Sequence, residues 1–118
     1  MQKTEFNVRI SGGPNKWRTV TGQVYGQLGV HKEEGAGACY FVTALMSGKR
    51  VYWFHLQGDA IRFARLVGEE PIFIKATTRA DGMFDGTVLY EMLIRRNINV
   101  DEFKRGYLVF NQLPDEVE

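Results

Sequence analysis

The sequence is poor in the residues that cross-link a chain, bind metals or span membranes. Cys39 is the only cysteine, so the chain can form no internal disulfide and no metal site with several sulfur ligands. A reducing compartment suits such a chain. No window approaches the roughly 18 apolar residues that a membrane-spanning helix needs, and residues 1–5 lack the apolar stretch of a signal peptide. We therefore expect a cytoplasmic protein that does not enter a membrane.

Catalytic motifs are also scarce. His31 and His55, the only histidines, fall on different expected elements and have no ligand spacing with acids or with Cys39, so we expect no metal centre. Cys39 lies in an apolar stretch, which is typical of a buried core thiol. The glycine-rich residues 11–14 lack the Gly-Lys-Ser/Thr ending of a phosphate-binding loop. We expect no enzymatic activity and no cofactor; a small enzyme with an unfamiliar site is the alternative.

The chain has almost no net charge, but its acids are unevenly distributed. It carries 15 basic and 14 acidic residues, and three of the acids are Asp115, Glu116 and Glu118. We expect a single domain over residues 1–113 followed by an acidic tail over 114–118. Without the tail's three acids the body is mildly basic, which permits phosphate binding and equally suits an ordinary solvated surface.

Aromatic residues and glycine are abundant, and they favour strands and turns. Phe, Trp and Tyr make up 13% of the 118 residues, and there are 13 glycines. Phe6, Val8 and Ile10 alternate with polar residues, which predicts a strand. Residues 17–30 predict one long strand with Val20 and Val24 on its core face, bent at two glycines.

The middle of the chain predicts a hairpin and a helix. Residues 38–46 and 50–56 form two apolar strands joined by Ser47-Gly48-Lys49. Asp59 can cap a short helix that ends at Gly68. Residues 71–79 predict the next strand, and residues 107–110 a terminal one. Residues 87–95 favour a strand, although Leu89, Met92 and Leu93 also lie at helical spacing.

This order of elements is mainly β and predicts a small five-stranded barrel. A short helix between strands 3 and 4 is the arrangement of the OB-fold, here with extensions at both termini. Residues 53–58 (WFHLQG) and residues 72–79 (IFIKATTR) resemble single-stranded DNA-binding proteins of bacteria and mobile elements. The resemblance covers roughly residues 17–95. It implies sequence-tolerant binding of single-stranded DNA, a role in replication or transfer of a mobile element, and a homo-oligomer, either a dimer or a tetramer.

An OB-like barrel would present aromatic and cationic side chains on its outer face. Strict alternation along the strands places one set of side chains opposite the core residues. That set stacks bases or contacts phosphates: Trp17, Tyr25, Trp53, His55, Phe73, Lys75 and Arg79. Lys49 and Arg50 border it at the hairpin and complete the predicted binding face. Alternatively, Trp53 packs under the terminal extension and Trp17 against the amino-terminal strand.

The same exposed aromatics suit a protein partner. Large aromatic side chains anchor protein interfaces as well as bases, and a net charge near zero removes any strong bias towards polyanions. The alternative function is therefore a β-barrel protein-interaction module or an inhibitor of a host enzyme.

Overall fold

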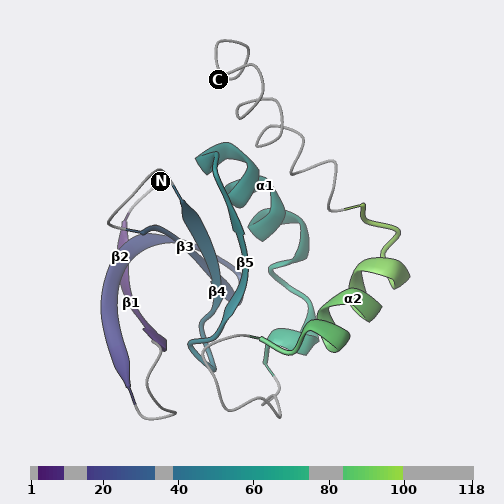
Figure 1. Ribbon diagram of the computed structural model, residues 1–118, viewed down its shortest axis with the longest axis horizontal. Coiled ribbons are helices and arrows are strands. Elements are labelled where there is room, and N and C mark those ends of the chain that lie inside the picture. Colours follow the sequence, from purple (N-terminus) through teal and green to yellow (C-terminus); the bar gives the residue numbers. More distant parts are fainter. Residues whose placement is uncertain (1–2, 10–15, 34–38, 75–83, 100–118) are drawn as a thin grey trace.

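Five antiparallel strands form one sheet in the order of the sequence. The computed structural model describes residues 3–9, 16–33, 39–74 and 84–99. Each strand pairs with the next along the chain (Figure 1): β1 (Thr4–Arg9), β2 (Trp17–Tyr25), β3 (Leu28–Lys32), β4 (Tyr40–Ala44) and β5 (Arg50–Phe54). The helical elements follow the sheet: α1 (Gln57–Val67), the 3₁₀ helix η1 (Pro71–Phe73) and α2 (Gly86–Arg95). The mainly β prediction is confirmed.

The single long strand expected over residues 17–30 is wrong, because the chain reverses at Gly26. Gly26 adopts a φ of 60°, a left-handed conformation that glycine reaches at no steric cost. Tyr25 consequently pairs with Leu28 across a tight hairpin between β2 and β3. The turn also changes which residues are buried: Tyr25 is 9% exposed and belongs to the core, whereas Val24 is only half-buried.

The hairpin between β4 and β5 is confirmed. Phe41 pairs with Trp53 and Val42 with Tyr52, and a register shift follows at Thr43. The turn closes through two backbone hydrogen bonds, from Gly48 N–H to the Ala44 carbonyl (2.7 Å) and from Ala44 N–H to the Lys49 carbonyl (2.9 Å).

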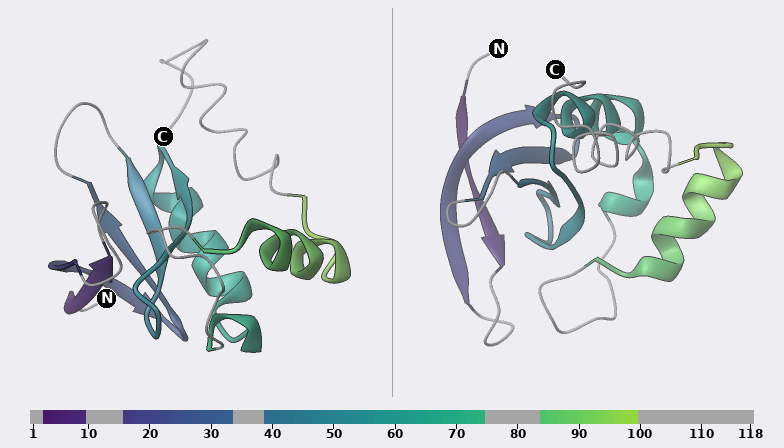
Figure 2. Two further views of the ribbon diagram at one scale, coloured as in Figure 1. Left: turned by 60° about the horizontal axis from the view of Figure 1, so that its bottom comes forward. Right: turned by 45° about the horizontal axis from the view of Figure 1, so that its top comes forward.

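Helix α1 covers one face of the sheet. In Figures 1 and 2, α1 lies alongside the strands and α2 lies farther from them. Phe63 of α1 is fully buried, with its ring centroid 5.5 Å from that of Phe54 and 5.8 Å from that of Tyr52. The helix ends before Gly68 as expected but begins at Gln57, and its N-cap is Leu56, so Asp59 does not cap it. The Asp59 carboxylate instead accepts a hydrogen bond from Arg62 (2.9 Å).

The described residues of the segments that were expected to form the fourth and fifth barrel strands contain helices instead of strands. The expected strand over 71–79 begins as η1, because proline at the first position suits a helical turn. The expected strand over 87–95 is α2: the Asp85 carboxylate accepts a hydrogen bond from Thr87 N–H (2.9 Å), and three apolar side chains at helical spacing, Leu89, Met92 and Leu93, are buried. The strand prediction for 87–95 is therefore wrong.

The sheet is consequently an open meander and not the closed OB-like barrel. Within the described ranges, no strand follows β5, so α1 comes after the last strand instead of between the third and fourth. The expected strand over 107–110, the tail over 114–118, and Ile10, Lys75 and Arg79 lie outside the described residues. Among the helices that are described, none is both long and apolar enough to cross a membrane.

The sheet is strongly coiled, and β1 folds towards the face that α1 does not cover. Figure 2 shows β2 as a long curved strand. The Phe6 ring of β1 occupies the space beside Gly29, where an added Cβ would lie 2.6 Å from Phe6 Cζ. At the other end of β1, Arg9 N–H donates to the Gly48 carbonyl at 2.7 Å. These contacts hold the β1–β2 ribbon against the β4–β5 turn.

A buried carboxylate ties α2 to the α1–η1 connection. Glu70 is 7% exposed and accepts hydrogen bonds from Arg95 (3.0 Å) and Arg96 (2.6 Å). Arg96 also donates to the Leu66 carbonyl at 3.2 Å. The hydrogen bonds from Arg95 and Arg96 lower the pKa of Glu70. This cluster orients α2 on the body of the protein.

Candidate functional site

The described residues divide into a basic strand half and a slightly acidic helical half. In the ranges 3–9, 16–33 and 39–56 there are seven lysines and arginines against two glutamates. In the ranges 57–74 and 84–99 there are four arginines against five acids. The net charge of the whole chain hides this separation. Among the described residues, the positive charge therefore lies mainly on the strand half.

The most exposed surface of that half is one face of the β1–β2 ribbon. Glu5, Asn7 and Arg9 of β1 pair with Thr21, Thr19 and Trp17 of β2, and these six residues alternate with the ones that turn inward. All six are exposed except Arg9, which is half-buried. We call these six residues the ribbon face. Its centre is polar, with the Thr19 hydroxyl donating to Asn7 Oδ1 at 2.8 Å.

Trp17 and Arg9 form the end of the ribbon face nearest the β4–β5 turn. The Trp17 side chain is 44% exposed, and the Arg9 guanidinium carbon lies 5.0 Å from its ring centroid. Arg9 Nε also donates to the Ser47 carbonyl at 3.1 Å. The six-membered ring of the indole lies so close to Gly48 that an added Cβ there would overlap it. A flat ring and a cation are thus held together at the surface.

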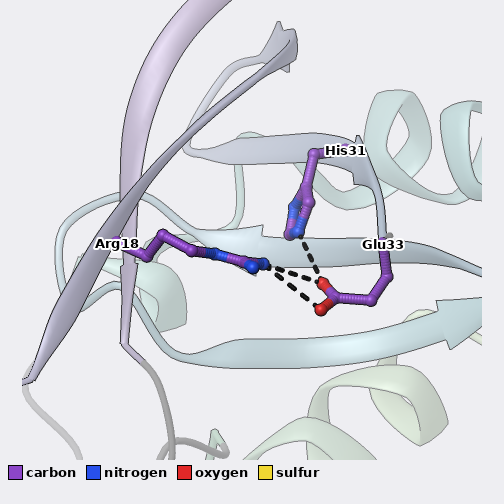
Figure 3. Close-up of polar contacts among 3 residues, drawn as sticks. All are labelled: Arg18, His31 and Glu33. Carbon is purple, nitrogen blue, oxygen red and sulfur yellow. Dashed lines mark hydrogen bonds and ion pairs between the residues drawn. The ribbon is translucent and has the colours of Figure 1, made fainter. Parts of the chain in front are cut away.

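The inward face of the same coil carries a polar cluster that the sequence did not suggest. The Arg18 guanidinium, which leaves β2 on the face opposite Trp17, donates to both oxygens of Glu33 at 3.0 and 3.3 Å (Figure 3). Glu33 Oε1 also lies 3.3 Å from His31 Nε2. His31 and Glu33 are two residues apart on one strand face, but only the curvature of β2 brings Arg18 to them.

His31 is held neutral by its surroundings. Its side chain is 4% exposed and contacts the rings of Phe6 and Phe41, with centroids 6.0 and 5.9 Å away. Burial is the main cause that lowers the pKa of His31, and Glu33 partly opposes it. Among the described residues, Nδ1 has no hydrogen-bond partner. The cluster links Arg18 of β2 to His31 of β3 through Glu33.

Cys39 lies beside this cluster but is not an activated thiol. Its carbonyl accepts a hydrogen bond from Glu33 N–H at 2.8 Å. Burial, with a smaller effect of the Glu33 carboxylate, raises the pKa of the Cys39 thiol, so the nucleophilic thiolate is disfavoured. In the part of the chain that the structure describes, no three His, Cys, Asp or Glu side chains converge as metal ligands.

Several residues predicted for the binding face lie in the core instead. Tyr25 is 9% exposed, Lys49 is 4% exposed and Phe73 is fully buried. Tyr25 and Phe73 were expected to point outward, and that orientation is wrong for both. Phe73 lies on η1, where its ring centroid is 5.3 Å from that of Phe84. These three residues cannot present an exposed stacking surface.

The remaining predicted residues form a second, half-buried cluster. Trp53 is half-buried, with its ring centroid 5.2 Å from that of His55, and it is paired in register with Phe41. The Arg50 guanidinium carbon lies 4.7 Å from the Phe41 ring centroid. Trp53 therefore belongs with β4 and β5, whereas Trp17 belongs with β1 and the turn at Gly48. The structure does not join the two tryptophans into one platform.

Comparison with known proteins identifies no relative: the chain matches no protein-family model, no curated protein and no solved structure.

Proposed function

We propose that this protein binds single-stranded nucleic acid, with little dependence on sequence, across the ribbon face. The observation that carries the proposal is the Trp17–Arg9 pair, a half-exposed indole with a guanidinium 5.0 Å from its ring centroid on the basic half of the protein. Unpaired bases stack on aromatic rings and on the planes of arginine guanidinium groups. Every base has such a face, so stacking requires no particular sequence.

The rest of the ribbon face supplies groups that suit a sugar–phosphate backbone. Thr19, Thr21 and Asn7 are exposed and polar, and hydroxyl and amide groups hydrogen-bond to phosphate oxygens and sugars. Lys16 is exposed next to Trp17. Lysine and arginine contacts with phosphates release counterions, so affinity falls as salt is added. The role in replication or transfer of a mobile element, and the dimer or tetramer, stay part of this proposal.

Binding of a fluorescein-labelled oligothymidine, followed by anisotropy at several salt concentrations, tests the proposal. We expect saturable binding at low salt, weakened by Trp17→Ala by roughly 5- to 150-fold, since stacking of one base contributes about 1–3 kcal/mol. Tyr90→Ala is the matched control, because Tyr90 is 57% exposed but lies on α2 in the acidic half. The control should bind as the unsubstituted protein does.

Equal binding by both variants would reject the ribbon face, provided that their thermal melts match that of the unsubstituted protein. No anisotropy change at low salt would reject nucleic-acid binding altogether. In that case the protein-interaction module is the function to pursue, since exposed aromatic side chains anchor such interfaces.

A further inference from the structure

A small cleft opens where β2 leaves β3. β2 pairs with β3 only from Gln23 to Tyr25, while its earlier residues pair with β1. Gly22 still lies tightly against Val30 and His31 of β3, and the two strands separate on its amino-terminal side, at Thr21. The cleft has a volume of about 160 Å³ and is bounded on its far side by β4 and by Gln57, the first residue of α1.

Residues with hydrogen-bond donors line this cleft, and for most of them the described part of the chain shows no side-chain partner. Seven lining residues carry side-chain N–H or O–H groups: Lys3, Thr21, Gln23, His31, Lys32, Tyr40 and Gln57. Gln23 uses its carbonyl oxygen to accept from Tyr25 (2.9 Å), which leaves its amide N–H groups available. Within the described part of the chain, neither lysine forms an ion pair. Donors that end in an open cleft favour a ligand that accepts hydrogen bonds.

The charged side chains that line the cleft are of one sign; the Glu33 carboxylate, which is not a lining residue, lies 3.3 Å from His31 Nε2 and is paired with Arg18. Two ammonium groups line it, and among the described lining residues there is no aspartate or glutamate. The first turn of α1 adds to this, since the amino-terminal end of a helix carries partial positive charge and α1 has no side-chain cap there. Lysine is an established phosphate ligand in proteins. The lining therefore suits a compact anion.

The size of the cleft limits the anion to a single small group. Pockets for drug-sized ligands have volumes of about 300–1,000 Å³, whereas this cleft has about 160 Å³. A whole nucleotide exceeds it, but one phosphate group with its surrounding oxygens does not. The three terminal oxygens of a phosphate monoester accept several hydrogen bonds at once. This capacity matches the several donor-bearing residues that line the cleft.

We infer that the cleft binds a phosphate monoester, and that in a nucleic-acid strand this is the phosphate at the strand end. The second part rests on the proposed function. Thr21 belongs both to the ribbon face and to the cleft lining, and it is four residues along β2 from Trp17, about 13 Å at the rise of an extended strand. A terminal phosphate in the cleft thus leaves the following nucleotides on the ribbon face, towards Trp17.

The test compares short oligothymidines that are identical except for a phosphate at the 5′ end, at the 3′ end or at neither. We expect one phosphorylated form to bind about tenfold more tightly than the unphosphorylated form, as a charged hydrogen-bonded contact warrants. Lys32→Gln should abolish this ratio. Lys16→Gln is the matched control, because it removes an exposed charge outside the cleft and should weaken all three oligothymidines equally.

A second arm uses inorganic phosphate alone, observed by ³¹P line broadening and by the thermal melt of the protein. Phosphate binding that is lost in Lys32→Gln but kept in Lys16→Gln, with no oligothymidine binding, would support the cleft and reject only the nucleic-acid function. Tyr40→Phe, which removes one donor, should weaken phosphate binding by several-fold without altering the fold. Equal affinity for all three oligothymidines together with no phosphate binding would overturn the inference.

Discussion

The indole of Trp17 lies directly against Gly48, although 30 residues separate them in the sequence. Gly48 has a φ of 73°, which side-chain-bearing residues rarely adopt, and it leaves the space that the ring occupies. Through this contact and the bond from Arg9 N–H to the Gly48 carbonyl (2.7 Å), the turn at residues 45–49 supports the end of the ribbon face. The exposure of Trp17 depends on this support.

Gly48→Ala is therefore expected to destabilise the protein and to displace Trp17. The left-handed conformation alone costs about 1–2 kcal/mol for an L-residue, and overlap of the new methyl group with the indole adds to it. Urea unfolding monitored by circular dichroism measures the decrease in the free energy of unfolding. Tryptophan emission reports the new environment of the Trp17 ring.

Gly58→Ala is the control for that substitution. Gly58 lies in α1, where an added Cβ meets nothing within 4 Å. Alanine should stabilise this position by about 0.5–1 kcal/mol through its higher helix propensity. If Gly48→Ala proved as stable as Gly58→Ala, the tight packing of Trp17 on the turn would be wrong.

Glu70→Gln should lower stability at neutral pH by about 1–2 kcal/mol, because charge-assisted hydrogen bonds are lost and both arginines are partly solvated. The pKa of Glu70 is lower in the folded protein than in the unfolded chain. Its contribution is therefore fully present above the unfolded pKa of about 4.3 and disappears as the pH falls through the folded value. The variant should lack this acid-dependent loss.

Urea unfolding between pH 7 and pH 3 measures this effect. Glu91→Gln removes an exposed carboxylate from α2, the helix that carries Arg95, and serves as the control. A pH dependence in Glu70→Gln that matches that of the unsubstituted protein would show that the two arginines do not stabilise the Glu70 carboxylate.

His31 should make the protein less stable in mildly acidic solution. Because burial lowers the pKa of His31 in the folded state, the unfolded chain binds the proton more readily. The contribution of neutral His31 to stability is present above its unfolded pKa of about 6.5. It is lost as the pH falls from there through the pKa of His31 in the folded protein. Arg18 and Arg50 act in the same direction as burial, and Glu33 opposes them.

Proton NMR titration of the His31 ring measures its pKa directly, with His55→Gln used to assign the two imidazole signals. Glu33→Gln should lower the pKa of His31 further, since it removes the interactions that raise it. A titration of His31 above pH 6.5 would contradict the proposed balance between burial and the Glu33 carboxylate.

The local patterns that predicted structure correctly were those in which one short segment decides the outcome. Alternation at Phe6 and Val8 predicted β1, the turn at Gly48 predicted the β4–β5 hairpin, and Gly68 marked the end of α1. Trp17 was likewise expected on an exposed face, and its 44% exposure agrees with that expectation. The strand, the hairpin and the helix end depend on short segments, whereas the exposure of Trp17 also depends on its contact with the distant Gly48.

The errors arose where two local structures had similar propensities. Residues 87–95 carry a β-branched and apolar composition, yet the Asp85 cap and the burial of Leu89, Met92 and Leu93 make them a helix. In the same way, alternation along residues 17–30 gave no indication that Gly26 would reverse the chain. The cleft between β2 and β3 exists only because of that reversal, so no sequence pattern pointed to it.

By itself the sequence determined a strand-rich chain with one cysteine, a mildly basic composition ahead of the last three acids, and the positions of a hairpin and a helix end. Composition and backbone conformation near single glycines are sufficient for these properties. Only the tertiary structure decided which aromatic rings are exposed and which donors share a cleft. Both depend on the coiling of β2, and this coiling results from contacts between residues far apart in the chain, such as Phe6 with Gly29 and Trp17 with Gly48.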